Sequence, residues 1–134
     1  MIVLDASALV ELLLDTPAGR SIATRIADPD LGLHVPHLAD VEVAQALRRY
    51  AKDGELDAAA AGAALDDLRS LDLQRHAHEP LLDRIWELRQ NFSAYDAVYV
   101  ALAEVLDCVL LTCDGRLARA PRVRPRVELV KPST

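Results

Sequence analysis

Short apolar runs alternate along this chain with longer segments of helical periodicity, and this alternation constrains the fold more than any other feature. Nearly continuous apolar runs predict four strands, at residues 2–4, 33–35, 108–112 and 127–130. Strands that are apolar on both sides need cover on both faces, which is typical of parallel sheets with helical crossovers. The pattern therefore predicts an α/β fold, a three-layer α/β/α sandwich with a short-stranded parallel sheet. The last strand is predicted at a sheet edge, because Glu128 interrupts it.

The segments between the predicted strands carry helix signals. Apolar periodicity and capping residues predict helices at residues 6–14, 17–27, 37–52, 57–70, 81–90 and 93–106. Thr16 followed by Pro17, for example, supplies an N-cap and a proline at the first helical position. Within residues 94–106 only Asp96 and Glu104 are charged, so we expect this helix to be buried. The length of 134 residues is near the commonest domain size, and we expect one domain over the whole chain.

The charge of the chain is unevenly distributed. The net charge of −6, taken alone, argues against a nucleic-acid-binding protein. However, residues 1–114 carry nine basic and twenty acidic side chains, whereas residues 115–134 carry six basic and one acidic. A chain divided in this way can bring acidic and basic groups to one site, so the net charge does not exclude nucleic acid as a ligand.

The first residues do not have the pattern of an export signal or a membrane span. Asp5, Ser7 and Glu11 interrupt the apolar start, and no basic segment precedes it. The two cysteines, Cys108 and Cys113, are too few for a disulfide scaffold, and we expect both to be free thiols. Together these features predict a cytoplasmic protein with no membrane segment.

Four carboxylates lie at the margins of the predicted core. Asp5 follows the first strand and Asp114 follows the third, at the edge where the carboxyl ends of parallel strands meet. Asp96 lies in the first turn of the buried helix, and Glu42 lies on the shoulder of the apolar stripe of the third helix. A carboxylate at such a margin is unfavourable unless something compensates it, and the nearby sequence offers no buried cation.

Carboxylates that converge repel one another, and a cation is needed to keep them ionised together. Oxygen ligands of this kind suit Mg²⁺, with Mn²⁺ as a second possibility. Such an ion, bound beside a phosphate, lowers the pKa of a water and stabilises an in-line displacement at phosphorus. The four acids therefore predict metal-assisted hydrolysis of a phosphodiester bond.

Each acid also has a purely structural interpretation. Asp5 and Asp96 both suit helix N-termini, and Asp114 precedes a glycine as in an ordinary turn. Glu42 fits a structural role least well. Separately these signals are weak, and their joint placement is what favours the catalytic interpretation.

The same residues lie in segments that resemble the PIN-domain ribonucleases, most closely the VapC-type toxins of bacterial toxin–antitoxin pairs. The segments are Met1–Leu9, Glu42-Val43-Ala44, Tyr95-Asp96-Ala97 and Leu111-Thr112-Cys113-Asp114. No single motif is long, but four motifs in order over essentially the whole chain make the resemblance specific. Cys113 departs from the pattern, where a small aliphatic residue is expected, and we expect it to alter packing rather than chemistry.

The resemblance implies a PIN-like α/β/α sandwich and an endoribonuclease that depends on Mg²⁺ or Mn²⁺. It carries over an acidic site consisting of Asp5, Glu42, Asp96 and Asp114. Asp5 and Asp96 are the implied direct metal ligands, and the other two acids ligate directly or through water. Ser7 and Thr112 match hydroxyl positions that hold ligands or water in place. The resemblance further implies an RNA substrate, a homodimer, and a cognate antitoxin protein whose C-terminal segment covers the site.

Arginines near these acids are candidates for contact with RNA or with the antitoxin, because guanidinium groups bind phosphates and carboxylates. Five of them fall within 11 residues, at Arg116, Arg119, Arg122, Arg124 and Arg126. Arg48 and Arg49 form a second group, and Arg49 lies two turns from Glu42 on nearly the same side of its helix. The structural alternative for the first group is a solvated loop.

Other conspicuous residues point less clearly to a site. His34 with His37, and His76 with His78, have no cysteines near them, so they make a weak case for zinc. Trp86 is expected in the core or in an interface rather than as a platform for stacking bases.

Two other classes of function remain open at this point. A phosphoacceptor signalling domain would explain a strand ending in Asp5 and another ending in Thr112, but it also needs paired acids after the first strand, which are missing. A non-catalytic binding module would use the acids structurally and the arginines to bind a partner. The effect of Mg²⁺ on thermal stability distinguishes the binding module from the metal-dependent nuclease, because the ion stabilises the folded chain only if the acids form a metal site.

Overall fold

Five short strands form one parallel sheet in the order β3-β2-β1-β4-β5 in the computed structural model, which describes residues 1–120 and 125–132. The strands are β1 (Ile2–Leu4), β2 (Leu33–Pro36), β3 (Leu73–His76), β4 (Val109–Thr112) and β5 (Val127–Leu129). In the register, Val3 lies opposite His34 of β2 on one side and Leu110 of β4 on the other. Because β1 is central, the residue after it emerges in the middle of the carboxyl edge of the sheet.

Helices connect the strands, and most of them begin at a side-chain cap. They are α1 (Ala6–Leu13), α2 (Pro17–Arg25), α3 (Leu38–Lys52), α4 (Ala58–Ser70), α5 (Leu82–Glu87), α6 (Ala94–Leu106) and α7 (Gly115–Ala118), with a 3₁₀ turn, η1 (Glu79–Leu81), before α5. Side-chain oxygens of Asp5, Thr16, Asp57, Ser93 and Asp114 accept hydrogen bonds from free backbone N–H groups in the first turns. Asp5 and Asp96 thus lie at helix starts, as their structural interpretation predicts, and Asp114, interpreted as a turn residue, caps the short helix α7.

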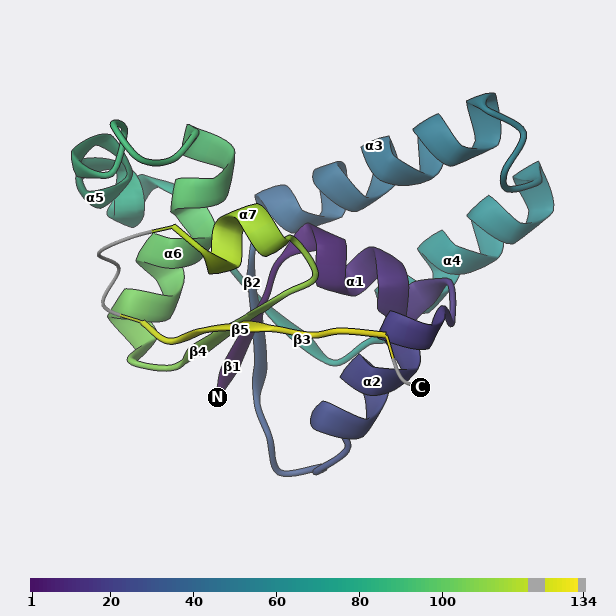
Figure 1. The fold of residues 1–134 in the computed structure, drawn as a ribbon, viewed down its shortest axis with the longest axis horizontal. Helices are drawn as coiled ribbons and strands as arrows, with labels where there is room; N and C mark the ends of the chain where they lie inside the picture. The colour runs from purple at the N-terminus through teal and green to yellow at the C-terminus, as the bar shows by residue number, and fades with distance from the viewer. Residues whose placement is uncertain (121–124, 133–134) are drawn as a thin grey trace.

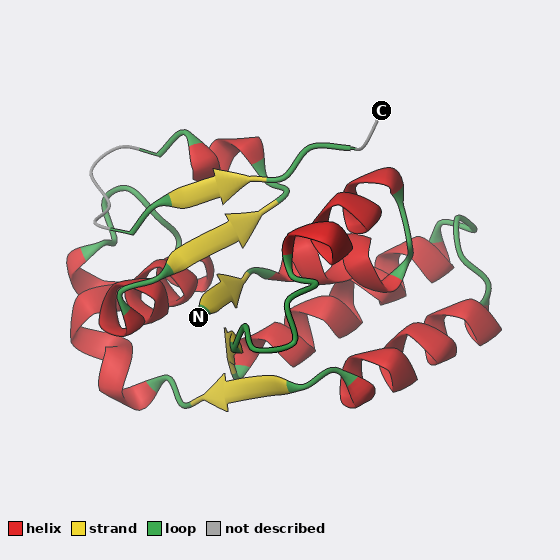
Figure 2. Ribbon diagram, turned by 90° about the horizontal axis from the view of Figure 1, so that it is seen from below, coloured by secondary structure: helices red, strands yellow, loops and turns green. Residues whose placement is uncertain are grey.

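The helices lie in two groups with the sheet between them. Figure 1 shows α5 and α6 together on one side and α1 to α4 on the other, and Figure 2 shows the strands as a twisted layer with helices on either side of it. The first group rests on the sheet through α6, which contacts β1, β2 and β4, and the second through α1 and α3. The three-layer α/β/α sandwich on a parallel sheet is therefore confirmed.

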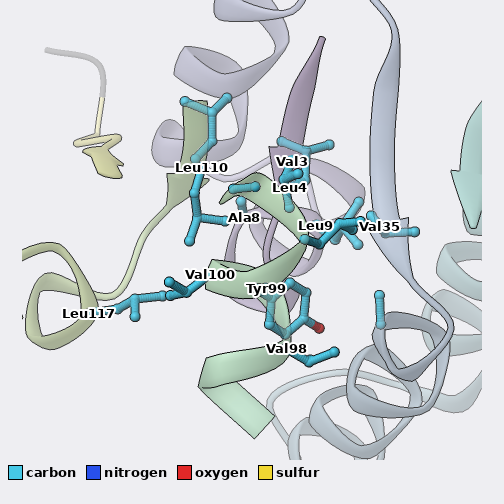
Figure 3. Packing of buried hydrophobic residues seen from close by; sticks show 14 of the residues in the cluster. Val3, Leu4, Ala8, Leu9, Val35, Val98, Tyr99, Val100, Leu110 and Leu117 are labelled. Carbon is cyan, nitrogen blue, oxygen red and sulfur yellow. The ribbon is translucent and has the colours of Figure 1, made fainter. Parts of the chain in front are cut away.

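The core follows from this arrangement of layers. Val3 and Leu4 of β1, Val35 of β2 and Leu110 of β4 are fully buried, and they pack with side chains of the neighbouring helices (Figure 3). Helix α6 is buried over seven consecutive residues, from Ala97 to Ala103, as its lack of charge predicts. This helix therefore carries Asp96, at its first turn, on a rigid and buried support.

Several features of the fold differ from the sequence predictions. Helix α7 was not predicted, because a solvated loop was the structural alternative for its stretch. Strand β3 was not predicted, because Leu73 is the only apolar residue among its four and the strand lies at an edge. The helix predicted at 81–90 is shorter, with its α-helical part ending at Glu87. Trp86 is 67% exposed and carries Arg89 over its ring at 4.5 Å, so the core alternative for it is wrong, while the interface alternative stays a prediction. The predicted edge position of β5 is confirmed.

No helix in the part of the chain that the structure describes is long and apolar enough to cross a membrane. Cys108 and Cys113 are both free, as predicted.

Candidate active site

A cavity of about 310 Å³ lies at the carboxyl edge of the sheet, and all four predicted acids line it. Asp5 comes from the end of β1, Glu42 from α3, Asp96 from α6 and Asp114 from the turn between β4 and α7. These positions are far apart in the sequence, and they converge because β1 and β4 are neighbours with α3 and α6 on opposite sides of them.

Asp5 is the most buried of the four acids, at 5% exposed. Its Oδ1 accepts hydrogen bonds from Ser7 Oγ at 2.7 Å and from the Ala8 N–H at 2.9 Å, and its Oδ2 accepts one from Thr112 Oγ1. Burial raises the pKa of this carboxyl above its usual value, and the charge of Asp114 adds to the rise, while the three hydrogen bonds oppose it. The side chain is therefore fixed in position and held in surroundings that disfavour its charge.

Ser7 and Thr112 connect this corner of the site to strand β4. Ser7 Oγ accepts a hydrogen bond from the Cys113 N–H at 2.9 Å, and Thr112 Oγ1 accepts one from the Asp114 N–H at 2.9 Å. The two hydroxyls therefore fix the chain that leads into Asp114 at the same time as they hold Asp5.

Glu42 is held by a residue that the sequence analysis did not single out. The buried Tyr99 hydroxyl, on α6, donates a hydrogen bond to Glu42 Oε1 at 2.6 Å, and Figure 3 shows its ring packed among core residues. Desolvation raises the pKa of Glu42, and the negative charges of Asp96 and Asp5 raise it further. The spacing of Tyr99, three residues after Asp96 on one helix, is the signal that would have found it, because i and i+3 share a face.

Asp96 and Asp114 share a cation. Arg116 Nη2 lies 2.8 Å from Asp96 Oδ2 and 3.1 Å from Asp114 Oδ2. The Arg116 side chain is 64% exposed, whereas those of the two acids are 23% and 34% exposed. These hydrogen bonds and charges raise the pKa of Arg116, the contact with Asp96 most of all. Arg116, which the sequence analysis named only as a candidate contact for RNA or the antitoxin, is therefore paired with two of the acids, and it lies at the surface.

The remaining predicted arginines are distributed around the cavity or away from it. Arg49 lines the cavity on the α3 side, near Tyr50, whereas Arg48 does not line it. The guanidinium of Arg119 lies close to Gly115, and Arg126 lies 3.9 Å from Glu128. Arg122 and Arg124 lie outside the described residues. Glu11, a fifth carboxylate that the sequence analysis did not propose, also lines the cavity.

Comparison with known proteins assigns the family. A family model described as "PIN domain" matches residues 2–123. The chain belongs to the PIN-domain family.

Its relatives include proteins named VapC ribonucleases. It is 50% identical over 119 residues to "VapC ribonuclease Mb0985" of Mycobacterium bovis, a match that covers 88% of this chain and 89% of the relative. "Ribonuclease VapC1" of Mycobacterium tuberculosis is 42% identical over 130 residues, with 96% of this chain and 97% of the relative covered.

Two solved structures have a similar fold. PAE2754 from Pyrobaculum aerophilum superimposes with a TM-score of 0.67 at 28% identity, over 87% of this chain and 82% of that one. Mycobacterium tuberculosis VapC20, described as a sarcin-ricin loop cleaving toxin, has a TM-score of 0.69 at 18% identity, over 94% of this chain and 99% of that one. The second comparison bears on the fold alone.

The donor set of this PIN domain suits a hard divalent cation. The acids and hydroxyls at the cavity offer only oxygen ligands, which Mg²⁺ and Mn²⁺ prefer. The negative charges of Asp96 and Asp5 add to the rise in the pKa of Glu42 that burial causes, and a bound metal ion would relieve this repulsion. The Arg116 guanidinium already bridges two of the acids, Asp96 and Asp114. Among residues 1–120 and 125–132, however, no three His, Cys, Asp or Glu side chains stand close enough together to hold a metal ion. The carboxylates therefore share a cavity while each is bound to protein donors.

The histidines lie away from this cavity and pair across strands β2 and β3. His34 Nδ1 and His76 Nε2 are 2.9 Å apart, and His78 Nε2 accepts a hydrogen bond from the Leu38 N–H at 2.8 Å. The pairs are thus His34 with His76 and His37 with His78, rather than neighbours in the sequence. Cys113 is half-buried, and desolvation is the main cause that raises the pKa of its thiol to about 11.

Proposed function

We propose that this chain is a Mg²⁺-dependent endoribonuclease, with Mn²⁺ as a possible substitute, and that it acts as the toxin of a toxin–antitoxin pair. The observation that carries the proposal is the convergence of Asp5, Glu42, Asp96 and Asp114 on one cavity at the carboxyl edge of the sheet. The names of its relatives, VapC ribonucleases at 42 to 50% identity, support RNA as the substrate.

In this proposal Asp5 and Asp96 hold the ion directly, and Glu42 and Asp114 hold it directly or through water. Asp5 is suited to this role because Ser7, Thr112 and the Ala8 N–H fix its carboxylate before any ion arrives. Asp96 is suited because the α6 N-terminus favours an ionised acid at the first turn. When bound, the ion supplies positive charge that activates water and stabilises the phosphorane-like transition state of the displacement.

The protein's other residues orient the reactants. Tyr99 binds one oxygen of Glu42, which lines the cavity, and leaves the second oxygen for water or the ion. Arg49, at the wall of the cavity, is placed to bind a phosphate of the RNA chain, and Arg48, Arg116 and Arg119 are further candidates for contact with RNA or antitoxin. A homodimer in the cytoplasm, inhibited by its cognate antitoxin protein, completes the proposed role.

The test is cleavage of single-stranded RNA by the wild-type chain, with Mg²⁺ and with EDTA. Asp96→Asn keeps the shape of the side chain and removes its charge, and we expect it to lower the rate at least about 100-fold with an unchanged circular dichroism spectrum. Asp83→Asn is the matched control, because Asp83 is an exposed acid that does not line the cavity. Undiminished cleavage by the Asp96→Asn variant, or by the wild type in EDTA, would refute the proposal.

A further inference from the structure

Arg116 is held to the acidic site in an unusual way. Its backbone is fixed, because its N–H donates a hydrogen bond to Asp114 Oδ1 at 2.9 Å in the first turn of α7. Its side chain reaches the site through one atom only: Nη2 makes both contacts, to Asp96 Oδ2 and to Asp114 Oδ2. A single nitrogen shared by two acids lacks the planar fork that makes arginine–carboxylate pairs strong.

The exposure of this side chain allows it to leave. An ion pair in contact with solvent contributes little to stability and is screened by salt, because water and ions replace each partner readily. Rotation of the side chain alone would release both acids, since the backbone hydrogen bond to Asp114 does not involve the guanidinium.

A divalent ion and Arg116 compete for the same oxygens. Asp96 is a proposed direct ligand and Asp114 a second one, and the guanidinium occupies an oxygen of each. If the ion binds there, the guanidinium is expelled by like charge and loses its partners, yet it stays attached at the rim of the cavity. The new partner of suitable chemistry would be a phosphate of the RNA substrate.

We propose that Arg116 is an exchangeable cation, which neutralises Asp96 and Asp114 in the metal-free protein and binds an RNA phosphate once a divalent ion has replaced it. This inference rests on the proposed function, since it takes the acids as metal ligands. It explains how acids that repel one another coexist before the ion binds. It also predicts that one residue opposes metal binding and favours RNA binding.

The first measurement is calorimetric titration of MgCl₂ into the RNA-free full chain at fixed ionic strength. In Arg116→Gln the competing charge is gone, so we expect Mg²⁺ to bind at least about 5-fold more tightly than in the wild type, a coupling of the usual size between two ligands. Arg119→Gln is the matched control, because it removes the same charge from the end of the same helix without a contact to either acid. We expect it to change Mg²⁺ affinity much less.

The second measurement is binding of a fluorescent 2′-O-methyl RNA oligonucleotide by anisotropy, with its integrity checked on a gel. With saturating Mg²⁺ we expect Arg116→Gln to bind the oligonucleotide more weakly, and the slope of log affinity against log salt to fall by about 0.7, the value for one phosphate contact on a single strand. Without Mg²⁺ the two proteins should bind alike, because Arg116 is then engaged with the acids.

The outcomes separate this proposal from the proposed function. Tighter Mg²⁺ binding together with an RNA defect that needs Mg²⁺ supports the exchange. Equal or weaker Mg²⁺ binding in Arg116→Gln, or an RNA defect of the same size with and without Mg²⁺, overturns the exchange and leaves the nuclease proposal intact. If no Mg²⁺ binds to the wild type or to any variant, the metal-dependent nuclease is refuted and the exchange with it.

Discussion

Helix α6 is held near its two ends by arginine–carboxylate contacts of opposite character. Near the C-terminal end of α6, two nitrogens of Arg84 donate hydrogen bonds to Glu104, at 2.7 Å and 3.0 Å, and the Glu104 side chain is 3% exposed. At its first turn, Arg116 touches Asp96 with one nitrogen at 2.8 Å, and the Asp96 side chain is 23% exposed.

The difference shows what makes such a contact permanent. At Glu104 the fork geometry and the burial of the carboxylate fix the pair, which joins α5 to α6, two helices in contact. At Asp96 the single nitrogen and the solvent leave the carboxylate available to another cation. A carboxylate beside an arginine is therefore structural or functional according to its burial and geometry, and the sequence alone does not distinguish the two.

Substitution of each arginine in turn tests whether the two contacts differ in strength. Arg84→Gln takes the guanidinium from a buried carboxylate, and we expect the free energy of unfolding to fall by about 2 to 3 kcal/mol, below the full range for buried pairs because Arg84 is partly exposed. Arg116→Gln should leave the urea midpoint unchanged within error. Equal effects of the two substitutions on the midpoint would show that the two contacts do not differ in kind.

Tyr99 makes a buried contact to a carboxylate within the site itself, so it tests whether such a contact can also serve function. Tyr99→Phe removes the hydroxyl that holds Glu42 and keeps the ring in the core, so we expect RNA cleavage to fall about 10- to 100-fold, as for other groups that orient ligands. Mg²⁺ affinity should fall in the same variant, a readout that a packing role would not change. Tyr95→Phe is the control, since Tyr95 lies on the same helix but is 63% exposed. An equal loss in both variants would count against a positioning role for Tyr99.

Asp5 is a buried carboxylate with hydroxyl partners in place of an arginine, and it should therefore destabilise the metal-free protein. Burial on folding raises the pKa of Asp5 above its unfolded-state value, so its ionisation opposes folding at every pH above the unfolded-state pKa. Asp5→Asn keeps the helix cap and removes the charge, and we expect the Tm at pH 7 to rise by about 3 °C in EDTA. The gain in Tm should disappear as the pH falls below the unfolded-state pKa of Asp5, because the wild-type carboxyl is then neutral in the folded and the unfolded chain. A lower Tm for Asp5→Asn at pH 7 would contradict this account.

We expect the smallest effect at the His34–His76 pair, because it is a single contact between two imidazole rings. Burial, with the neighbouring His76 and the N-terminal amine, lowers the pKa of His34, so the folded state binds its proton less well than the unfolded chain. Stability should therefore fall as the pH decreases from 7.5 to 5, through and below the unfolded pKa of about 6.5. His34→Gln should flatten this profile by about 1 to 2 °C in Tm. An unchanged slope would assign the pH dependence to other groups.

Much of the fold could be predicted because its signals are local. The apolar runs identified β1, β2, β4 and β5, and the uncharged stretch of α6 predicted its burial. Strand β3 could not be predicted, because three of its four residues are polar. They are tolerated because β3 lies at the edge of the sheet and pairs only with β2. The core alternative for Trp86 was wrong for a similar reason. An aromatic residue between apolar neighbours is typical of a core, and only the packed structure shows that this side chain of α5 is exposed to solvent.

The candidate site divides in the same way. The four acids could be singled out because each is unfavourable at a core margin, and the structure brings all of them to one cavity. The resemblance named Ser7 and Thr112, which hold Asp5, but the partners of Glu42 and Asp96 could not be assigned, because they depend on distances across the fold. Tyr99 reaches Glu42 over 57 positions, and Arg116 reaches Asp96 over 20. Charge and burial at single positions are visible in a sequence, whereas pairing is a property of the packed chain.

Anomalous scattering from crystals of the full chain soaked in MnCl₂ would locate the proposed ion. We expect an anomalous peak in the cavity bounded by Asp5 and Asp96, with the Arg116 guanidinium moved away from Asp96. A fully soaked crystal with no peak in that cavity, and with Arg116 still bridging Asp96 and Asp114, would contradict this expectation.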